Sequence, residues 1–473
     1  MSAPFHTFVL SDIHLADAEL GHPGSSLWKR YKRPKFFIDQ SFKRLLRYLE
    51  KEIGDEPAEL VLNGDIFDFD SVMRLPKKPE FHISWLESKR GLFPEEKKSR
   101  FKMETILADH PVWVNALRQF IQKGHSVVFI IGNHDVELHW PLVQREILKS
   151  LRLSEVEESR VRFCEWFYIS NQDTAIEHGN QYDDYSVTKN PIHPLIKKGK
   201  RIQVRLPFGN IAGRYIMNGM GLFNPHVESS FLMEPKEYIQ FLFKYAIKAQ
   251  PFLLFNWLWG AIVSFWEAMT DGLLPALRDP LFAEQRVQEI AKKANATPEM
   301  VRTMNELAVH TAIHNPIKIA QELWLDRFIL LLVIAFISFH LYAMIYMISS
   351  APAIWFGLIF ALLVPVLIYY SKSIKSNVME AMEESLKHVP MIAHITKTKR
   401  IIFGHTHREQ HTMIDQVEVL NTGTWSPAFK DPECKVVMGQ ACFAWIRAKT
   451  AGHDSDRIAD LYSWDDPGIR KLT

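Results

Sequence analysis

A stretch of 44 residues without one charged side chain lies deep inside this chain and limits what the chain can fold into. It runs from Phe328 to Ser371, and 36 of the 43 residues in 328–370 are apolar. About 20 apolar residues in a helix cross the ~30 Å hydrocarbon layer of a bilayer. Ser349, Ser350 and Pro352 interrupt the stretch at its middle. The pattern predicts a transmembrane hairpin over 328–370, in which a tight turn joins two helical spans.

The flanks of this stretch predict how the hairpin is inserted. Trp324 and Arg327 precede it, and Lys372 and Lys375 follow it, whereas the turn is uncharged. Basic residues gather on the cytoplasmic side of membrane spans, and aromatic residues gather at the interfaces. We therefore expect a membrane protein with both hairpin ends, and the remainder of the chain outside the hairpin, in the cytoplasm. The alternative is a buried helical hairpin in a soluble core.

Over the whole chain the composition is that of an ordinary globular protein. The 473 residues are 47% hydrophobic and 23% charged, with a formal net charge of +2. These values exclude a disordered or collagen-like chain. Three cysteines without paired spacing exclude a disulfide framework and a cysteine zinc motif, so a reducing compartment is expected. The opening residues MSAPFHTFVLSD lack the basic and apolar regions of a signal peptide.

Short apolar runs alternate with helical periodicity in the rest of the chain. The runs end in polar or glycine-containing turns and lie at 8–10, 60–62, 127–131 and 401–403. Between them, apolar residues recur at i, i+3, i+4 and i+7 over 42–49, the spacing of one helix face. The alternation predicts an α/β fold whose ligands gather beyond the carboxyl ends of the strands.

Five polar clusters follow predicted strands. They are Asp12-Ile13-His14, Gly64-Asp65-Ile66-Phe67-Asp68, Gly132-Asn133-His134-Asp135, His178-Gly179-Asn180 and Gly404-His405-Thr406-His407. Carboxylates and imidazoles are ligands for divalent transition metals. The glycines permit tight turns that aim neighbouring side chains at one point. Together the clusters indicate a metal-dependent active site.

With these clusters the sequence resembles the calcineurin-like metallophosphoesterase superfamily, whose blocks are DxH, GDxxD, GNH[D/E], a lone His and GHxH. The resemblance covers about residues 5–190 and 398–447. The phrases SDIHL, LNGDIFDF, GNHDVEL, HGNQYD and NTGTW are most similar to the UDP-2,3-diacylglucosamine pyrophosphohydrolases of lipid A synthesis. The resemblance implies a four-layer α/β/β/α sandwich with a two-metal centre.

The resemblance also implies a ligand set. One metal is held by Asp12, His14 and His407, the other by Asn133, His178 and His405, and Asp65 bridges them. Mixed oxygen and nitrogen donors favour two divalent ions of Mn²⁺, with Fe or Zn²⁺ as alternatives, over Mg²⁺ or Ca²⁺. Two such ions bind phosphate oxygens, lower the pKa of a bridging water and stabilise in-line attack on phosphorus.

Two further residues take catalytic roles by the same resemblance. His134 is expected to stabilise the transition state and protonate the leaving oxygen, with Asp68 orienting it. Asn180 departs from the pattern, because many relatives carry His or Asp at that position, so it is left out of the ligand set.

The insertion between His178 and Gly404 is 225 residues long and contains the hairpin. Ligands on both sides of it must build one site, so the chain must cross the membrane an even number of times. We therefore expect the other apolar stretch, 251–266, in the interface plane or in a lid; a buried core helix is the alternative. The predicted division is a metallophosphoesterase core over 1–190 and 398–473, with a helical, membrane-associated insert over 191–397.

Basic residues cluster near the first metal motif and at the start of the insert. Seven Lys or Arg and no Asp or Glu lie in 185–227, and another basic run lies at 29–35. Beside a membrane segment these runs favour an anionic membrane surface or a substrate headgroup as partner. The sequence shows no signature of nucleic acid binding. The candidate substrate-binding residues are Asn133, Lys29, Arg30, Arg33, Lys197, Lys198, Lys200 and Arg201.

The leading hypothesis is a membrane-anchored, two-metal phosphoesterase that cleaves a phosphate or pyrophosphate bond of an amphiphilic substrate, for example a nucleoside-diphosphate lipid. One alternative is hydrolysis of a soluble nucleotide or phosphodiester, with the hairpin only as an anchor. The other alternative is a metal-binding membrane scaffold without turnover.

Overall fold

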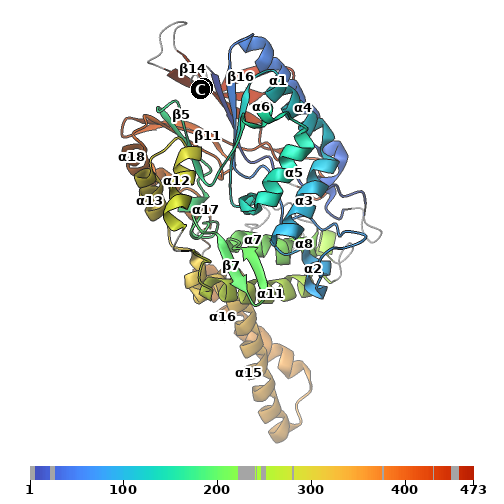
Figure 1. Cartoon of the computed structure of the whole chain (residues 1–473). Coiled ribbons are helices and arrows are strands. Elements are labelled where there is room, and N and C mark those ends of the chain that lie inside the picture. The colour runs from blue at the N-terminus through green and yellow to red at the C-terminus, as the bar shows by residue number, and fades with distance from the viewer. Residues whose placement is uncertain are drawn as a thin grey trace.

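Two β-sheets lie face to face at the centre of the structure, with helices on both outer sides (Figure 1). This computed structural model describes residues 6–21, 27–221, 240, 242–246, 252–279, 282–374, 376, 378–429, 431–448 and 457–472. Pro251, the first residue of the predicted interfacial stretch, lies outside the described residues.

The first sheet has seven strands and the second has five. In spatial order the first sheet contains β16 (Ile469–Leu472), β15 (Arg457–Trp464), β14 (Cys442–Ala448), β1 (His6–Leu10), β2 (Ala58–Asn63), β3 (Ser126–Ile130) and β4 (Val161–Cys164). The second contains β10 (Glu409–Ile414), β11 (Val417–Thr422), β9 (Arg400–Phe403), β6 (Thr174–Glu177) and β5 (Phe167–Ser170). Strands β1 to β4 run parallel, as do β6, β9 and β11. Two short pairs, β7 (Leu195–Lys198) with β8 (Arg201–Val204) and β12 (Ala428–Phe429) with β13 (Val437–Met438), stand apart.

Apolar side chains fill the space between the sheets. Val9 and Val61 of the first sheet belong to one buried cluster with Ile176 and Ile402 of the second. Because side chains alternate along a strand, the other face of each sheet is left for helices. Strands that are buried on both faces explain the near-continuous apolar runs of the sequence.

Helices cover the outer face of the first sheet. They are α1 (Asp39–Ile53), α3 (Glu96–Asp109), α4 (Pro111–Gln122) and α5 (Pro141–Leu151), with the short α6 (Glu155–Glu158) beyond them. In α1 the predicted apolar stripe, Phe42, Leu45, Leu46 and Leu49, is fully buried or nearly so. Mixed α/β sheets with helices therefore form as predicted.

Part of the predicted insert covers the second sheet. Ile290 of α12 (Ala283–Lys293), Val301 of α13 (Pro298–Leu307) and Ile392 of α18 (Ser385–Thr396) share a buried cluster with Ile401 and Val419 of that sheet. All three helices fall within 191–397. These residues thus build the outer layer of the sandwich, rather than a separate unit.

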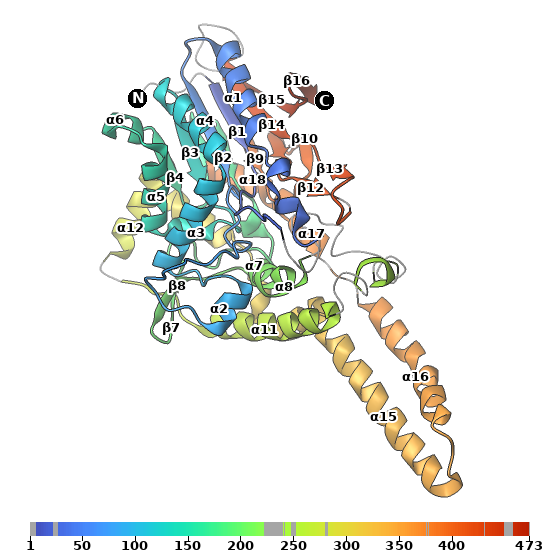
Figure 2. The same ribbon diagram turned by 90° about the vertical axis from the view of Figure 1, so that its right-hand side faces the viewer.

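Further elements, most of them short, connect these layers and close one end of the molecule. The helices are α2 (Trp85–Arg90), α7 (Phe208–Ala212), the π-helix η5 (Gly213–Met217), α8 (Asn218–Met220), the π-helix η7 (Leu242–Ala246), α11 (Leu253–Leu273), α14 (Pro316–Glu322) and α17 (Val378–Met382). The 3₁₀ turns are η1 (Arg30–Lys32), η2 (Pro34–Phe36), η3 (Val136–His139), η4 (Asn180–Tyr182) and η8 (Ala312–His314). Figure 2 shows α11 lying across the lower end of the domain, with α7 and α8 above it.

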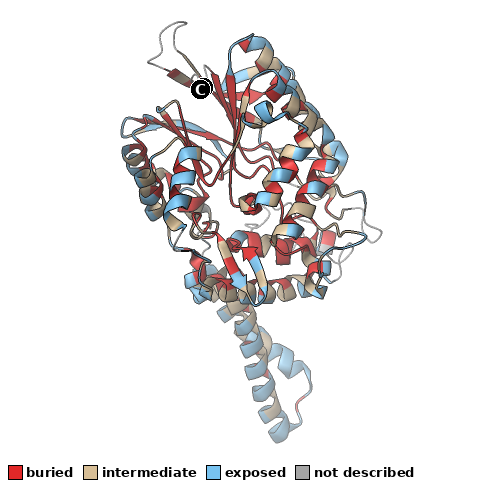
Figure 3. Ribbon diagram, in the orientation of Figure 1, coloured by how far each residue is buried: buried red, intermediate tan, exposed pale blue. Residues whose placement is uncertain are grey.

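Two long helices project from that end as a hairpin (Figure 2). They are α15 (Leu325–Ser349) and α16 (Ile354–Ser373), both long and apolar enough to cross a membrane. Only 11% and 0% of their most apolar segments are buried inside the molecule, and Figure 3 colours the helices mostly as exposed or intermediate. At their base Tyr370 donates a hydrogen bond to Asp326 (2.9 Å), and Arg327 donates to the carbonyl of Ile374 (3.1 Å). The alternative of a hairpin buried in a soluble core is therefore wrong, because the core does not cover these helices.

Candidate metal centre

The predicted metal ligands lie in the turns that follow five strands. Asp12 and His14 follow β1, Asp65 follows β2, Asn133 follows β3, His178 follows β6, and His405 and His407 follow β9. Since β1 to β3 belong to the first sheet and β6 and β9 to the second, these turns converge where the two sheets end side by side.

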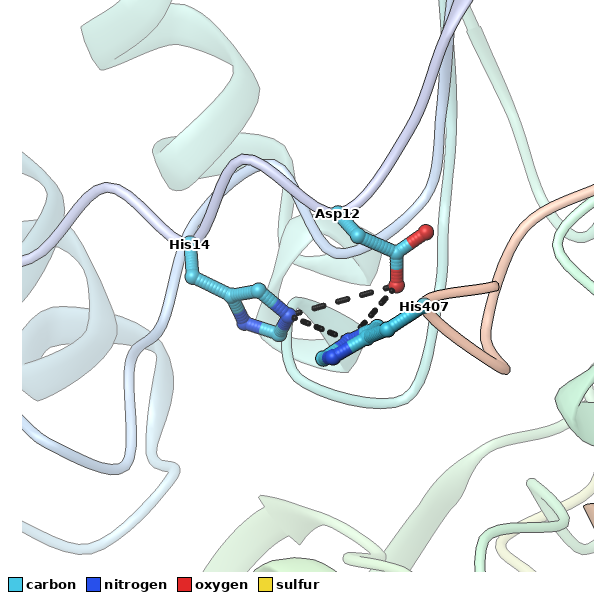
Figure 4. Close-up of side chains that lie close together, drawn as sticks. All are labelled: Asp12, His14 and His407. Atoms are coloured by element: carbon cyan, nitrogen blue, oxygen red, sulfur yellow. Dashed lines mark hydrogen bonds and ion pairs between the residues drawn. The ribbon is translucent and has the colours of Figure 1, made fainter. Parts of the chain in front are cut away.

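Asp12, His14 and His407 form the first group, and their side chains point toward one another (Figure 4). Asp12 Oδ1 lies 3.2 Å from His407 Nε2 and 3.9 Å from His14 Nε2. The two imidazole Nε2 atoms are 3.3 Å apart. The spacing is that of three donors arranged to share one cation. These three residues are the first ligand set that the resemblance implies.

Asp65, His178 and His405 form the second group, with one donor atom of each within 4.8 Å of the others. Asp65 Oδ2 lies 3.1 Å from His178 Nε2 and 3.9 Å from His14 Nε2, so one carboxylate oxygen faces both groups. His178 Nδ1 donates to the carbonyl of Asn63 at 3.0 Å, which turns Nε2 toward Asp65. Asp65 therefore lies between the two groups, and its role as the bridging ligand stays a prediction.

Asp12 Oδ1 and His178 Nε2 face only other members of the ligand groups, and the buried Asn133 Oδ1 has no hydrogen-bond partner. A buried polar atom left in this state costs about 1–3 kcal/mol. Carboxylate, amide and imidazole donors are the types that bind divalent transition ions. The described residues therefore fit a centre for two divalent cations, and the identity of the metal stays a prediction.

Protons balance the charge of the cluster when no cation does. Burial lowers the pKa of His178, but the carboxylates of Asp65 and Asp12 outweigh it and raise that pKa to about 9. Burial likewise raises the pKa of Asp65, yet the neighbouring His178 and His134 hold it well below its usual value. Because metal ligands must shed their protons, a divalent cation would supply the positive charge that these protons supply.

The turns that hold the ligands adopt an unusual backbone conformation. Asp12, His14, Asp65, His405 and His407 have φ values of 54°, 52°, 53°, 67° and 57°. Left-handed conformations are uncommon outside glycine, and they gather at functional sites where the surroundings enforce them. Five of the seven predicted ligands are held in this way.

His134 lies beside the centre with Asp68 behind it. Its Nδ1 is 3.5 Å from Asp68 Oδ1, and its ring packs edge-on against His14, with the ring centres 4.8 Å apart. Burial lowers the pKa of His134, but Asp65 and Asp68 raise it to about 10, so the imidazole carries a proton. This arrangement suits the predicted proton donor. His134 also forms a third group with His14 and Asp65 whose atoms could hold a cation, so the structure keeps both roles open.

Two acidic residues that were not in the predicted set hold these turns. Asp135 accepts from the backbone N–H groups of Gly132 (2.6 Å) and Ile66 (2.8 Å), which ties the Asn133 turn to the Asp65 turn. Asp183 Oδ2 lies 3.0 Å from His405 Nε2. Asp135 lies in the GNHD motif, and Asp183 lies in the phrase HGNQYD. Both residues therefore stand in recognisable motifs, but the sequence does not show which groups they bind.

Residues of the NTGTW phrase donate hydrogen bonds to the backbone of two ligand turns. Asn421 donates to the carbonyl of Gly404 at 2.7 Å, and Thr424 and the backbone of Trp425 both donate to the carbonyl of Asp12 at 3.0 Å. The phrase therefore fixes the turns that carry Asp12 and His405.

Asn210 and Arg214, on α7 and η5, were missed because they carry no motif. The amide of Asn210 donates to the carbonyl of Asn133 (2.8 Å) and to Asp70 Oδ2 (2.7 Å). The buried Arg214 guanidinium lies 2.8 Å from Asp70 Oδ1 and 3.6 Å from Glu137 Oε1. These contacts join the insert to the turn that carries Asn133 and His134.

The predicted basic residues have different surroundings from one another. Lys29 is buried and donates to Asn218 Oδ1 at 2.8 Å, and Lys198 pairs with Glu267 and Asp271 at 2.6 and 2.7 Å. Lys197 and Lys200 are exposed on the β7–β8 pair, and Arg201 stacks over the Phe93 ring. Arg30 is the first residue of η1, and Arg33 follows η1. Their roles in substrate binding stay predictions.

Replacing Gly132 by alanine is expected to disrupt the centre. A Cβ at this position would lie 2.4 Å from Asp65 Oδ1 and 2.6 Å from the Asp65 nitrogen, so the bridging carboxylate must move. We expect metal affinity to fall about 10- to 100-fold, the range seen when a supporting contact of a ligand is lost. Isothermal titration calorimetry with Mn²⁺ measures this affinity. Gly213→Ala, whose Cβ would meet no atom within 4 Å, is the matched control and should bind Mn²⁺ unchanged. Equal affinity of both variants would contradict the geometry.

A comparison with family models agrees with this site. Residues 5–248 match the family described as calcineurin-like phosphoesterase, which is more than half of the chain. The chain therefore belongs to the calcineurin-like phosphoesterase family. Membership indicates a metal-dependent phosphoester hydrolase. His405 and His407 lie beyond the matched residues, and only the fold brings them to the others.

Comparison with solved structures finds Vps29 from Entamoeba histolytica, as the wild type complexed with Zn²⁺ and as a single mutant. Each is 17% identical, with a TM-score of 0.14, over 18% of this chain. The chain spans 44% of the length of that relative. A comparison with curated proteins gave no match.

Proposed function

We propose that this protein is a membrane-anchored, two-metal phosphoesterase that hydrolyses a phosphate or pyrophosphate bond of a lipid-linked substrate. The observation that carries the proposal is the position of the hairpin. It is inserted between His178 and His405, two members of one ligand group, and its helices are almost wholly exposed. A membrane segment at this place tethers the metal centre itself, rather than a distant domain.

The class of substrate follows from the sequence phrases and the site together. The resemblance of SDIHL, LNGDIFDF and NTGTW to the UDP-2,3-diacylglucosamine pyrophosphohydrolase branch supports a nucleoside-diphosphate lipid. Such a molecule has its acyl chains in the bilayer and its pyrophosphate at the surface. The basic flanks of the hairpin support a cytoplasmic catalytic domain.

The residues divide the chemical work between binding and proton transfer. Two cations held by the two groups, when bound, would polarise the phosphoryl group and lower the pKa of a water. Asp65 is shared and fixes the distance between the groups. His134 protonates the leaving oxygen, and Asp68 holds its Nδ1 so that Nε2 is directed to the substrate.

Paired substrates that differ only in their lipid test the proposal. The full chain in nanodiscs with Mn²⁺ should hydrolyse a bilayer-embedded nucleoside-diphosphate lipid with kcat/KM at least about tenfold above that for the water-soluble sugar nucleotide, because membrane anchoring raises the local substrate concentration. Product release is followed by mass spectrometry. Equal rates would support the soluble-nucleotide alternative. Metal binding without turnover of either substrate would support the scaffold alternative.

A further inference from the structure

Helix α11 presents one packed face and one bare apolar face. Gly260, Ala261, Ser264 and Ala268 are buried against the segment made of α7, η5 and α8. The approach is close, because a Cβ on Gly260 would lie 2.6 Å from the Tyr215 carbonyl oxygen. Small residues at this spacing fix α11 firmly to the catalytic domain.

The opposite face of α11 exposes large apolar side chains to solvent. Phe255, Ile262, Trp266 and Leu273 are 66%, 53%, 68% and 87% exposed. Their spacings of seven, four and seven residues place them on one side of the helix. An exposed apolar stripe of this length is unusual for a surface in contact with water and marks an interaction site.

Neighbouring elements extend the stripe. Trp85 of α2 is 67% exposed and packs edge-on against Trp259 of α11, with the ring centres 5.8 Å apart. Ile202 of β8 and Leu277, which follows α11, are 45% and 44% exposed. Tryptophans at the rim of an apolar surface are typical of the membrane interface. We name this surface, made of Trp85, Phe255, Ile262, Trp266 and Leu273, the α11 platform.

The platform is continuous with the hairpin. Helix α11 contacts both α14 and α15, and Figure 2 shows α15 descending from one end of α11 at a steep angle to it. If α15 crosses a bilayer, α11 lies near the plane of its surface. Exposed cations stand on the adjacent elements, namely Lys89 on α2 and Lys197 and Lys200 on the β7–β8 pair. They match the charge of anionic lipid headgroups.

We propose that the α11 platform docks flat on the bilayer that the hairpin spans, with anionic phospholipid as its partner. This inference rests on the membrane anchorage in the proposed function and adds a second contact, which fixes the tilt of the catalytic domain. The α7–α8 segment connects α11 to the metal centre, since it packs on α11 and its Asn210 donates a hydrogen bond to the carbonyl of Asn133. Docking therefore holds the ligand groups close to the headgroup layer, where a lipid-linked phosphate lies.

Spin labels at three exposed positions of the full chain test the depth of the platform. Ile262→Cys reports on α11, Phe336→Cys on the middle of α15, and Val156→Cys on α6, at the far end of the domain (Figure 2). Each is made with Cys434→Ser, because the other two cysteines are buried. In nanodiscs of phosphatidylcholine and phosphatidylglycerol, power saturation compares access by oxygen with access by a water-soluble nickel complex.

We expect the label at 262 to be accessible to oxygen and shielded from nickel, at a depth between those at 336 and 156. A label at 262 that behaves like the one at 156, while that at 336 lies in lipid, overturns the platform and leaves the anchorage intact. Shielding at 262 from both reagents shows a protein contact and also overturns it. A label at 336 in water overturns the anchorage and with it the platform.

An activity measurement gives an independent reading. Ile262→Asp with Trp266→Asp should lower the ratio of kcat/KM for the bilayer substrate to that for the soluble one about tenfold, because the charges oppose burial and repel anionic lipid. Val156→Asp is the control, because Val156 on α6 is also an exposed apolar residue. This variant should leave the ratio of the two kcat/KM values unchanged. An unchanged ratio in the double variant contradicts the platform.

Discussion

Replacing Asp65 by asparagine is expected to lower kcat/KM by on the order of 10³ or more, the scale of effect that follows removal of a central catalytic group. One oxygen of this carboxylate faces both ligand groups, at 3.1 Å from His178 and 3.9 Å from His14. Asparagine keeps the shape and can still accept the His134 N–H, which now lies 2.7 Å from Asp65 Oδ1. It removes the charge that a cation pair needs between its members. Hydrolysis of bis-p-nitrophenyl phosphate with added Mn²⁺ measures the loss.

Metal content distinguishes loss of the centre from loss of the fold. The Asp65→Asn protein should retain less Mn²⁺ after gel filtration than the unaltered protein, by elemental mass spectrometry, with unchanged far-ultraviolet dichroism. Asp173→Asn is the matched control, because Asp173 is also a paired carboxylate but binds Arg457 at the opposite end of the strands. It should lower thermal stability and leave the metal content intact. Full metal content and activity in Asp65→Asn would contradict the bridging role.

Replacing His134 by alanine is expected to lower kcat about 10²- to 10⁴-fold, the usual contribution of general acid catalysis, with metal content retained. Alanine keeps the backbone N–H of residue 134, which donates to Asp65, so the ligand turns should stay in place. The effect should depend on the leaving group. The kcat for a nitrophenyl ester should fall little, because nitrophenolate departs without a proton. The kcat for an ester with an alkoxide leaving group should fall most.

Asp68→Asn is the companion variant, because Asp68 Oδ1 lies 3.5 Å from His134 Nδ1 and is expected to orient that ring. It should show a smaller loss with the same dependence on the leaving group. If His134→Ala loses metal instead, the third group of His14, Asp65 and His134 is a binding set and the proton-donor assignment is wrong. If the loss is the same for both leaving groups, His134 stabilises charge without transferring a proton.

The polar clusters were readable from the sequence because each motif is local, and the resemblance to the metallophosphoesterase superfamily implied which of their residues are ligands. A short apolar run followed by glycine and an acidic residue or histidine predicts a strand and the turn beyond it, and parallel strands place such turns at one end of a sheet. The structure brings six of the predicted ligands into two groups on that basis. The hairpin could also be predicted from the sequence, because few other folded structures accommodate a long uncharged apolar stretch.

Contacts between distant segments were not readable. Nothing near Asn210 or Arg214 in the sequence indicates that they bind Asp70 and the Asn133 turn, because the pairing depends on how α7 and η5 pack. Lys29 and Lys198 looked like surface cations, yet one is buried against Asn218 and the other is paired on α11. The sequence gives the type of each side chain, whereas its burial and its partner are set by the fold.

The sequence by itself determined the chemistry of this protein: the carboxylate and imidazole donors, their order, and an apolar stretch of membrane-spanning length placed between them. The tertiary structure decided which donors share a group, that part of the predicted insert completes the sandwich, and that the apolar face of α11 points away from the core. The reason is that donor type and hydropathy are properties of single residues and short segments. Grouping, layering and exposure arise only when segments far apart in the chain exclude water from one another.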